Sequence, residues 1–134
     1  MKLILLILSL LLVSDRLIAQ GAADIYTTNN PERYNDSLAK QEIEKIYSML
    51  LSGNKFETLA EKYSQDPSNF NDGGKIDWCS YEILDPDFQK IILGLKLNES
   101  SKPFKTQFGY HIAQLLDKKG KEVLTRHILI RIWD

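Results

Sequence analysis

The sequence predicts one α+β domain, and three observations support this. The chain has 134 residues, of which 43% are hydrophobic and 26% charged, an ordinary globular balance of about one domain's length. Apolar residues recur every three to four positions in parts of the chain, which indicates helices, whereas β-branched runs elsewhere indicate strands. Helices and strands that come in runs, without strict alternation, favour α+β over a parallel sheet.

The first expected elements are a short strand and a long helix. The strand candidate covers residues 23–28 and ends at an Asn-Asn-Pro turn. The helix is expected from Asp36 to Leu51, and Gly53 follows it where a glycine most readily ends a helix. The inward-facing positions of this helix are expected to be Leu38, Ala39, Ile43, Ile46, Tyr47 and Leu50.

Two shorter helices are expected next. One contains the apolar positions Phe56, Leu59, Ala60 and Tyr63. The other begins after Asp85, which can cap it, with Pro86 in the first helical position. Its inner positions are expected to be Phe88, Ile91 and Ile92, and Gly94 ends it.

Residues that favour β-strands dominate the last third of the sequence. An extended segment at 103–108 precedes a strand from Gly109 to Asp117. After a turn at 118–121, the β-branched run from Val123 to Asp134 is typical of a further strand.

Composition excludes several classes of function. The net charge is −1, whereas nucleic-acid binding as the main role needs a basic surplus. A single cysteine, Cys79, rules out an internal disulfide framework, and we expect it to be a small core residue. Two histidines are too few for a metal cluster, and no glycine-rich phosphate loop is present. No cofactor and no metal are therefore expected.

The N-terminus has the features of an export signal. Lys2 precedes an apolar run from Leu3 to Val13, which is about half of the ~20 residues that a membrane-spanning helix needs. Ala19 offers a small residue for cleavage, so residues 1–19 are expected to be a signal peptide. An uncleaved membrane anchor is the alternative. The signal peptide predicts an exported protein that works outside the cytoplasm.

Three motifs carry a family resemblance. They are a helix that ends in Tyr63-Ser64-Gln65-Asp66, the double glycine Gly73-Gly74, and the strand motif Thr106-Gln107-Phe108-Gly109-Tyr110-His111-Ile112. In this order and spacing, over about residues 22–117, they resemble the parvulin family of peptidyl-prolyl cis/trans isomerases, found in exported foldases and SurA-like periplasmic chaperones. The resemblance implies an FKBP-like fold, with a small antiparallel sheet of about four strands flanked by three to four helices.

The same resemblance implies domain boundaries and a function for the chain. It implies an isomerase domain at residues 20–118, followed at 119–134 by an extra strand that resembles the opening of another parvulin unit. The implied partners are extended polypeptides with X–Pro bonds, outer-membrane proteins among them, and the implied location is the periplasm. No bond is broken in the reaction, because the ~18–20 kcal/mol barrier comes from the loss of amide resonance.

The resemblance assigns an apolar cup for the proline ring and polar groups beside it. The cup residues would be Ile76, Leu84, Phe88 and Phe108, although all four also suit a hydrophobic core. Asp66 falls where the family has a carboxylate or thiol near the substrate carbonyl, or is simply part of a solvated turn. His111 and Thr106 match the family's histidine and hydroxyl, or are a satisfied core histidine and an ordinary strand residue.

Asp24 departs from the family pattern. It stands where the family's first strand has a histidine that meets the histidine of the last strand, so Asp24 is expected to pair with His111. The function is therefore either an active isomerase or a catalytically weak peptide-binding chaperone module. A secreted structural module without a peptide site is a third possibility.

The terminal strand offers another partner for His111. If Lys118–Gly120 were a three-residue hairpin loop, His127 would lie directly opposite His111. The last strand would then replace the first and restore a histidine pair. The start of a tandem unit explains the same residues.

Overall fold

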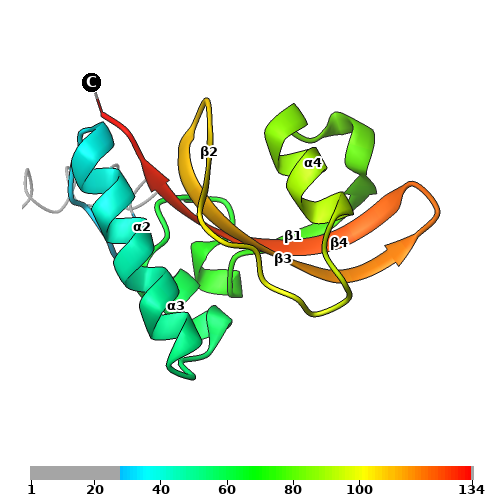
Figure 1. The fold of residues 1–134 in the computed structure, drawn as a ribbon, viewed down its shortest axis with the longest axis horizontal. Helices are drawn as coiled ribbons and strands as arrows, with labels where there is room; N and C mark the ends of the chain where they lie inside the picture. Colours follow the sequence, from blue (N-terminus) through cyan, green and yellow to red (C-terminus); the bar gives the residue numbers. More distant parts are fainter. Residues whose placement is uncertain (1–27, 134) are drawn as a thin grey trace, which may run out of the picture.

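The computed structural model describes residues 28–133, which form an antiparallel sheet with helices packed on it (Figure 1). The strand order is β1-β4-β3-β2. The strands are β1 (Lys75–Ser80), β2 (Phe104–Thr106), β3 (Gly109–Lys119) and β4 (Glu122–Arg131). The helices are α2 (Asp36–Leu51), α3 (Phe56–Tyr63) and α4 (Pro86–Leu93), with 3₁₀ turns η1 (Phe70–Asp72) and η2 (Tyr81–Ile83). The predicted α+β class and four-stranded antiparallel sheet are confirmed.

Local capping explains why the helices begin where the sequence predicts. The side chain of Asn35 accepts a hydrogen bond from the backbone N–H of Leu38 and caps α2. The Asp85 carboxylate caps α4 in the same way. The expected inward position of Leu38 was wrong, since 48% of this side chain is exposed. The stripe of α2 that faces the sheet is narrow and is centred on Ala39, Ile43 and Ile46.

Strand β1 was missed in the sequence. It lies at the edge of the sheet, most of its side chains are exposed or half-buried, and a register shift between Ile76 and Cys79 interrupts its pairing. An edge strand of this kind has no regular alternation of apolar residues. The expected signal peptide and the expected strand at 23–28 lie outside the described residues, except for Thr28, which is not in a strand.

Strand β4 occupies the centre of the sheet, paired with β3 on one side and β1 on the other. It returns from β3 through a two-residue turn at Gly120–Lys121. The predicted last strand therefore exists and belongs to the same sheet as β3. That residues 119–134 also open a second unit stays a prediction.

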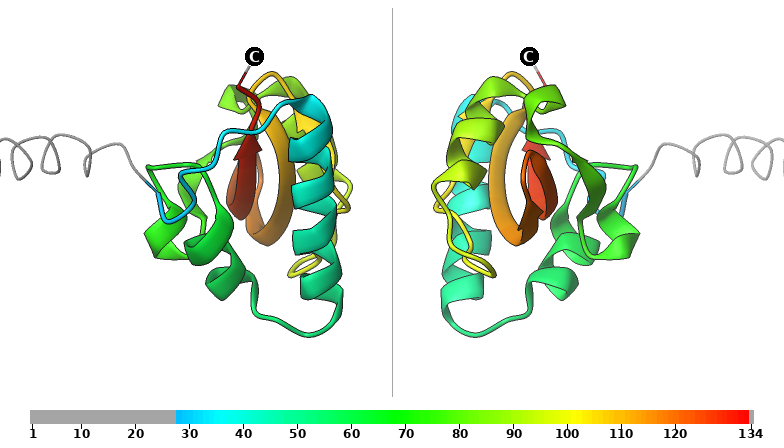
Figure 2. Two further views of the ribbon diagram at one scale, coloured as in Figure 1. Left: turned by 90° about the vertical axis from the view of Figure 1, so that its left-hand side faces the viewer. Right: turned by 90° about the vertical axis from the view of Figure 1, so that its right-hand side faces the viewer.

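The side chains of β3 and β4 alternate between two packed faces. Ile112, Ile128 and Ile130 point toward α2 and α3, which cover one face. Ala113, Leu115 and Val123 point to the other face, where α4 packs through Phe88 and Ile92. Figure 2, which looks along the strands, shows β3 and β4 side by side among the helices. Within residues 28–133, no helix is both long and apolar enough to cross a membrane.

Candidate active site

A hollow of about 290 Å³ opens on the α4 face of the sheet. This volume is near the lower end for ligand pockets. Its lining contains the four residues predicted for the proline cup and the predicted Asp66 and His111. The full lining is Asp66, Ile76, Leu84, Asp85, Phe88, Phe108, His111, His127, Leu129 and Arg131.

The four predicted cup residues differ in burial. Phe88 is 4% exposed, and its ring meets the rings of His111 and His127 edge-on, with centroids 5.8 Å and 5.7 Å away. Ile76 and Leu84 are half-buried at the walls, and Phe108 is 53% exposed. Phe88 is therefore a core residue as well as a lining residue, so the two interpretations of this position are compatible. That these side chains contact substrate stays a prediction.

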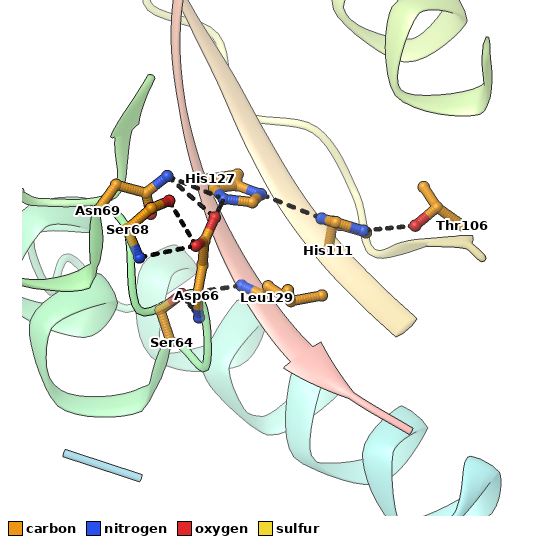
Figure 3. Close-up of polar contacts among 8 residues, drawn as sticks. All are labelled: Ser64, Asp66, Ser68, Asn69, Thr106, His111, His127 and Leu129. Atoms are coloured by element: carbon orange, nitrogen blue, oxygen red, sulfur yellow. Dashed lines mark hydrogen bonds and ion pairs between the residues drawn. The ribbon is translucent and has the colours of Figure 1, made fainter. Parts of the chain in front are cut away.

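A continuous polar chain borders the hollow and links Thr106 to Asp66 (Figure 3). Thr106 Oγ1 lies 2.7 Å from His111 Nε2. His111 Nδ1 lies 3.1 Å from His127 Nδ1, and His127 Nε2 lies 2.7 Å from Asp66 Oδ2. The two imidazole rings are near-parallel, at 23°. Both histidines and Thr106 are buried, at 3%, 6% and 5% exposure.

One arrangement of protons satisfies every contact in this chain. An ionised Asp66 can only accept, so His127 Nε2 carries a proton and donates it. With both rings neutral, His111 Nδ1 donates to His127 Nδ1, and His111 Nε2 accepts from the Thr106 hydroxyl. Thr106 Oγ1 in turn accepts from the backbone N–H of Phe108 at 3.1 Å. All four hydrogen bonds then run in one direction, toward the carboxylate.

Electrostatics support an ionised Asp66 and a neutral His111. Burial alone would raise the pKa of Asp66, but hydrogen bonds from His127 and Ser68 outweigh it and hold that pKa well below its usual value. Burial lowers the pKa of His111 to about 3, and the proximity of His127 contributes in the same direction. The site therefore combines a fixed anion with a neutral imidazole.

The loop after α3 holds the Asp66 carboxylate in place. Ser68 donates to Oδ1 through its backbone N–H at 3.0 Å and its hydroxyl at 2.6 Å, and Asn69 Nδ2 donates to Oδ2 at 3.0 Å. The loop is also attached to β4, because Leu129 N–H donates to Ser64 Oγ and Gln65 N–H donates to the Leu129 carbonyl. Because Leu129 lies two residues after His127 on β4, these hydrogen bonds also fix Asp66 relative to His127.

The double glycine Gly73-Gly74 holds the backbone of His127 in place from the β1 side. The backbone N–H of His127 donates to the Gly74 carbonyl at 2.9 Å. Gly74 has φ +76°, and a Cβ atom there would lie 2.1 Å from the His127 carbonyl oxygen. Only glycine allows β1 to approach β4 this closely. The second glycine of the Gly73-Gly74 motif is therefore required for steric reasons next to the site.

The predicted register of the histidine pair was wrong, although the rings do meet. His111 lies opposite Leu129, and His127 lies opposite Ala113. The hairpin has a two-residue turn and a register shift between Leu115 and Asp117, and these displace the pairing from the expected one. Because the two histidines share a face and are offset by two residues, their rings meet diagonally across the strands.

Several lining residues were not anticipated as site residues. His127 appeared only as a partner for His111, and Leu129, Asp85 and Arg131 were not considered. The spacing of two between His127, Leu129 and Arg131 in an expected strand would have placed them on one face. Asp24 lies outside the described residues, so its expected pairing with His111 stays a prediction.

The described part of the chain, residues 28–133, offers no metal site. In this range, no three His, Cys, Asp or Glu side chains form a group that could hold a metal ion. The imidazole nitrogens of the site instead face Thr106, Asp66 and each other. The arrangement can orient a peptide and present a carboxylate to it.

Comparisons with known proteins agree with the geometry. Residues 25–117 match the family model described as Rotamase: PPIC-type PPIASE domain. The chaperone SurA of Pseudomonas aeruginosa is 37% identical over 79 residues, which are 59% of this chain and 19% of that protein. The chaperone SurA of Pseudoalteromonas translucida is 47% identical over 64 residues, which are 48% of this chain and 15% of that protein. The chain thus spans about a fifth of the length of these relatives.

The family match covers α2, α3, α4 and β1 to β3, and it ends before β4. It contains Asp66, Thr106 and His111 but not His127. Because the matched segment is more than half of the chain, the chain belongs to the PpiC-type rotamase family, that is, it contains a parvulin-type peptidyl-prolyl isomerase domain.

Proposed function

We propose that this domain catalyses cis/trans isomerisation of X–Pro bonds in unfolded polypeptides outside the cytoplasm. The observation that carries the proposal is the largely apolar hollow directly beside a fixed, anionic Asp66. The proposed clients are exported proteins, outer-membrane proteins among them, in the periplasm. The similarity to SurA chaperones and the apolar run at 3–13 support that location.

The proposed mechanism needs no nucleophile. Phe88, Ile76 and Leu84 would hold the proline ring while the bond to its nitrogen rotates. In the planar amide the carbonyl oxygen carries partial negative charge, and this charge falls as resonance is lost on twisting. A carboxylate near the oxygen and the exclusion of water both destabilise the planar form relative to the twisted one. An acceleration of 10⁵ needs only about 7 kcal/mol of such preference.

The histidines and Thr106 would act by positioning. Their aligned hydrogen bonds fix the Asp66 carboxylate and keep its charge in place. The alternative, a catalytically weak peptide-binding module, rested on Asp24 in place of the family's first histidine. The contact between His127 and His111 supplies a histidine pair without residue 24, and this supports the active isomerase over that alternative.

The direct test is a protease-coupled assay on a proline tetrapeptide. We expect wild-type protein to accelerate isomerisation and Asp66→Asn to lower kcat/KM about 10- to 100-fold, since the variant loses the charge but keeps the shape. The matched control is Asp72→Asn, an exposed aspartate in η1, which should stay within twofold of wild type. Peptide binding without acceleration by the wild-type protein would favour the chaperone module instead.

A further inference from the structure

A second hollow lies at the edge of the sheet and is separate from the hollow beside Asp66. It has a volume of about 550 Å³, and the two hollows share no lining residue. Its walls come from α2, from the C-terminal part of α4 and from the segment that joins α4 to β2. The proposed isomerisation gives this edge hollow no role.

The segment that joins α4 to β2 runs along β3 like a short extra strand (Figure 1). Ser100 forms an antiparallel bridge to β3, and a hydrogen bond flanks it on each side. Ser101 N–H donates to the Ala113 carbonyl at 2.7 Å, and Leu115 N–H donates to the Glu99 carbonyl at 3.4 Å. In this antiparallel pattern, the N–H and C=O of the bridged residue itself point away from the partner strand.

The outward backbone groups of this segment are open. Within residues 28–133, neither the N–H nor the C=O of Ser100 makes a hydrogen bond, and the same holds for Lys102. Lys102 precedes Pro103 and therefore favours extended backbone, in which alternate residues point to the same edge. Pro103 ends this run, because it has no N–H. The open edge is thus short, and it is a template for one further strand.

Apolar side chains flank this edge on both faces of the sheet. Tyr47 of α2 packs on one face, and Leu95 packs on the other next to Ile91 of α4, all three half-buried in the wall of the edge hollow. The side chains of an added strand alternate between the two faces and would meet these residues in turn. A bound helix would leave the open groups of the edge unpaired, because its own backbone bonds are internal.

Charge favours an acidic segment over a second copy of this chain. The lining carries Lys90 and Lys102 against Glu99, and none of these three side chains is in an ion pair with another described residue. Two copies joined through this edge would bring their lysines close together, which is unfavourable. An acidic residue beside an apolar one in a different polypeptide would meet net positive charge instead.

We propose that the edge hollow binds an extended polypeptide segment by strand addition. The segment has apolar residues at alternate positions and an acidic residue beside them. Its backbone pairs with Ser100 and Lys102, and its apolar side chains contact Tyr47 on one face and Ile91 and Leu95 on the other. This site needs no proline, so the domain would hold a polypeptide independently of the proposed isomerisation.

The first test uses a proline-free, fluorescein-labelled nonapeptide in which Val and Thr alternate and Asp stands at both ends. Fluorescence anisotropy should show binding to wild-type protein. One derivative is N-methylated at the Val positions and another at the Thr positions, because the N–H groups of alternate residues point to opposite edges of a strand. One derivative should bind at least about 10-fold more weakly, and the other should stay within about twofold. Equal binding of both derivatives, or no binding of the parent peptide, would overturn the proposal.

The second test changes the edge of the protein. Lys102→Pro removes a backbone N–H and a charge, whereas the matched control Lys102→Gln removes only the charge. We expect about 10-fold weaker binding of the nonapeptide in the first variant and at most about threefold in the second. Circular dichroism and unchanged kcat/KM for a proline tetrapeptide would show that the variants are folded. Equal loss of binding in the two variants would overturn strand addition.

Two further measurements separate this site from the alternatives. Saturating nonapeptide should leave KM for the proline tetrapeptide unchanged, because the two hollows share no lining residue. A raised KM would place the nonapeptide in the proline hollow and overturn the proposal. Sedimentation should give a monomer for wild-type protein, and a dimer that dissociates in Lys102→Pro would assign the edge to a second copy. Binding of the nonapeptide by a protein without isomerase activity would reject the enzyme and support the edge site.

Discussion

The two faces of the sheet are made by the same long strands, β3 and β4, yet they bury different kinds of side chain. The face under α2 and α3 is filled by apolar residues such as Ile112, Ile128 and Ile130, all 0% exposed. The face under α4 buries two imidazoles next to apolar residues, and it leaves a hollow open to solvent. Alternation along a strand thus assigns packing to one face and polar chemistry to the other.

This division has an energetic reason. Buried polar groups are costly unless each finds a partner, and the α4 face provides one for each nitrogen of His111 and His127. The face under α2 and α3 is mostly apolar and can be close-packed, with Arg126 paired to Glu57 at its α3 end. Changes on the two faces should therefore affect different measurements.

The largest expected effect on stability is a cavity on the α2 and α3 face. Leu59 is 3% exposed in the core of α3. Leu59→Ala should lower the free energy of unfolding by about 2–5 kcal/mol, because it removes buried contacts and leaves a void. Urea denaturation monitored by circular dichroism measures this.

Phe108→Ala is the corresponding truncation on the α4 face, to be compared with Leu59→Ala. Phe108 is half-exposed at the hollow, so its loss should change the free energy of unfolding by less than about 1 kcal/mol but raise KM for a proline peptide several-fold. If both variants were equally destabilised, with KM unchanged, the division between the two faces would be wrong.

A smaller loss of stability is expected at the contact between β1 and β4. Gly74→Ala places a methyl group against the His127 carbonyl and should cost about 3 kcal/mol, because the two strands must separate. Gly120→Ala is the control, with φ +59° but open space around it, and should cost about 1 kcal/mol. Equal costs would mean that backbone conformation alone, without the close approach, accounts for Gly74.

A pH dependence of stability is also expected to arise on the α4 face. His111 protonates near pH 6.5 when unfolded but only near pH 3 when folded, so the unfolded state binds more protons between these values. The free energy of unfolding should therefore fall as pH falls, by about 2 kcal/mol between pH 7.5 and pH 5.0. Asp66 adds little in this window, because its stabilising ionisation is lost only below its unfolded pKa of 3.8.

The comparison protein for this measurement is His111→Gln. Urea denaturation of both proteins at the two pH values should give a smaller loss in the variant, since Gln does not titrate. An identical loss in the two proteins would show that His111 is not the responsible group.

Much of the fold was predictable because its determinants are local. Asp36–Leu51 and Pro86–Leu93 were expected with these bounds, since caps and apolar spacing act within a few residues. Strand β1 was not, because its partner β4 lies some 45 residues away and supplies the order that its own sequence lacks. In the site, Asp66, Thr106 and His111 were found through the family motifs, whereas Leu129 and Arg131 were not.

The sequence by itself determined the helices, the two long strands and the family to which the domain belongs, because these depend on local spacing and on motifs. The tertiary structure decided which segment lies at the centre of the sheet and how its register meets His111. A turn one residue shorter and a register shift moved the partner of His111 from His127 to Leu129. Strand pairing of this kind depends on packing between distant segments, and a local pattern does not specify it.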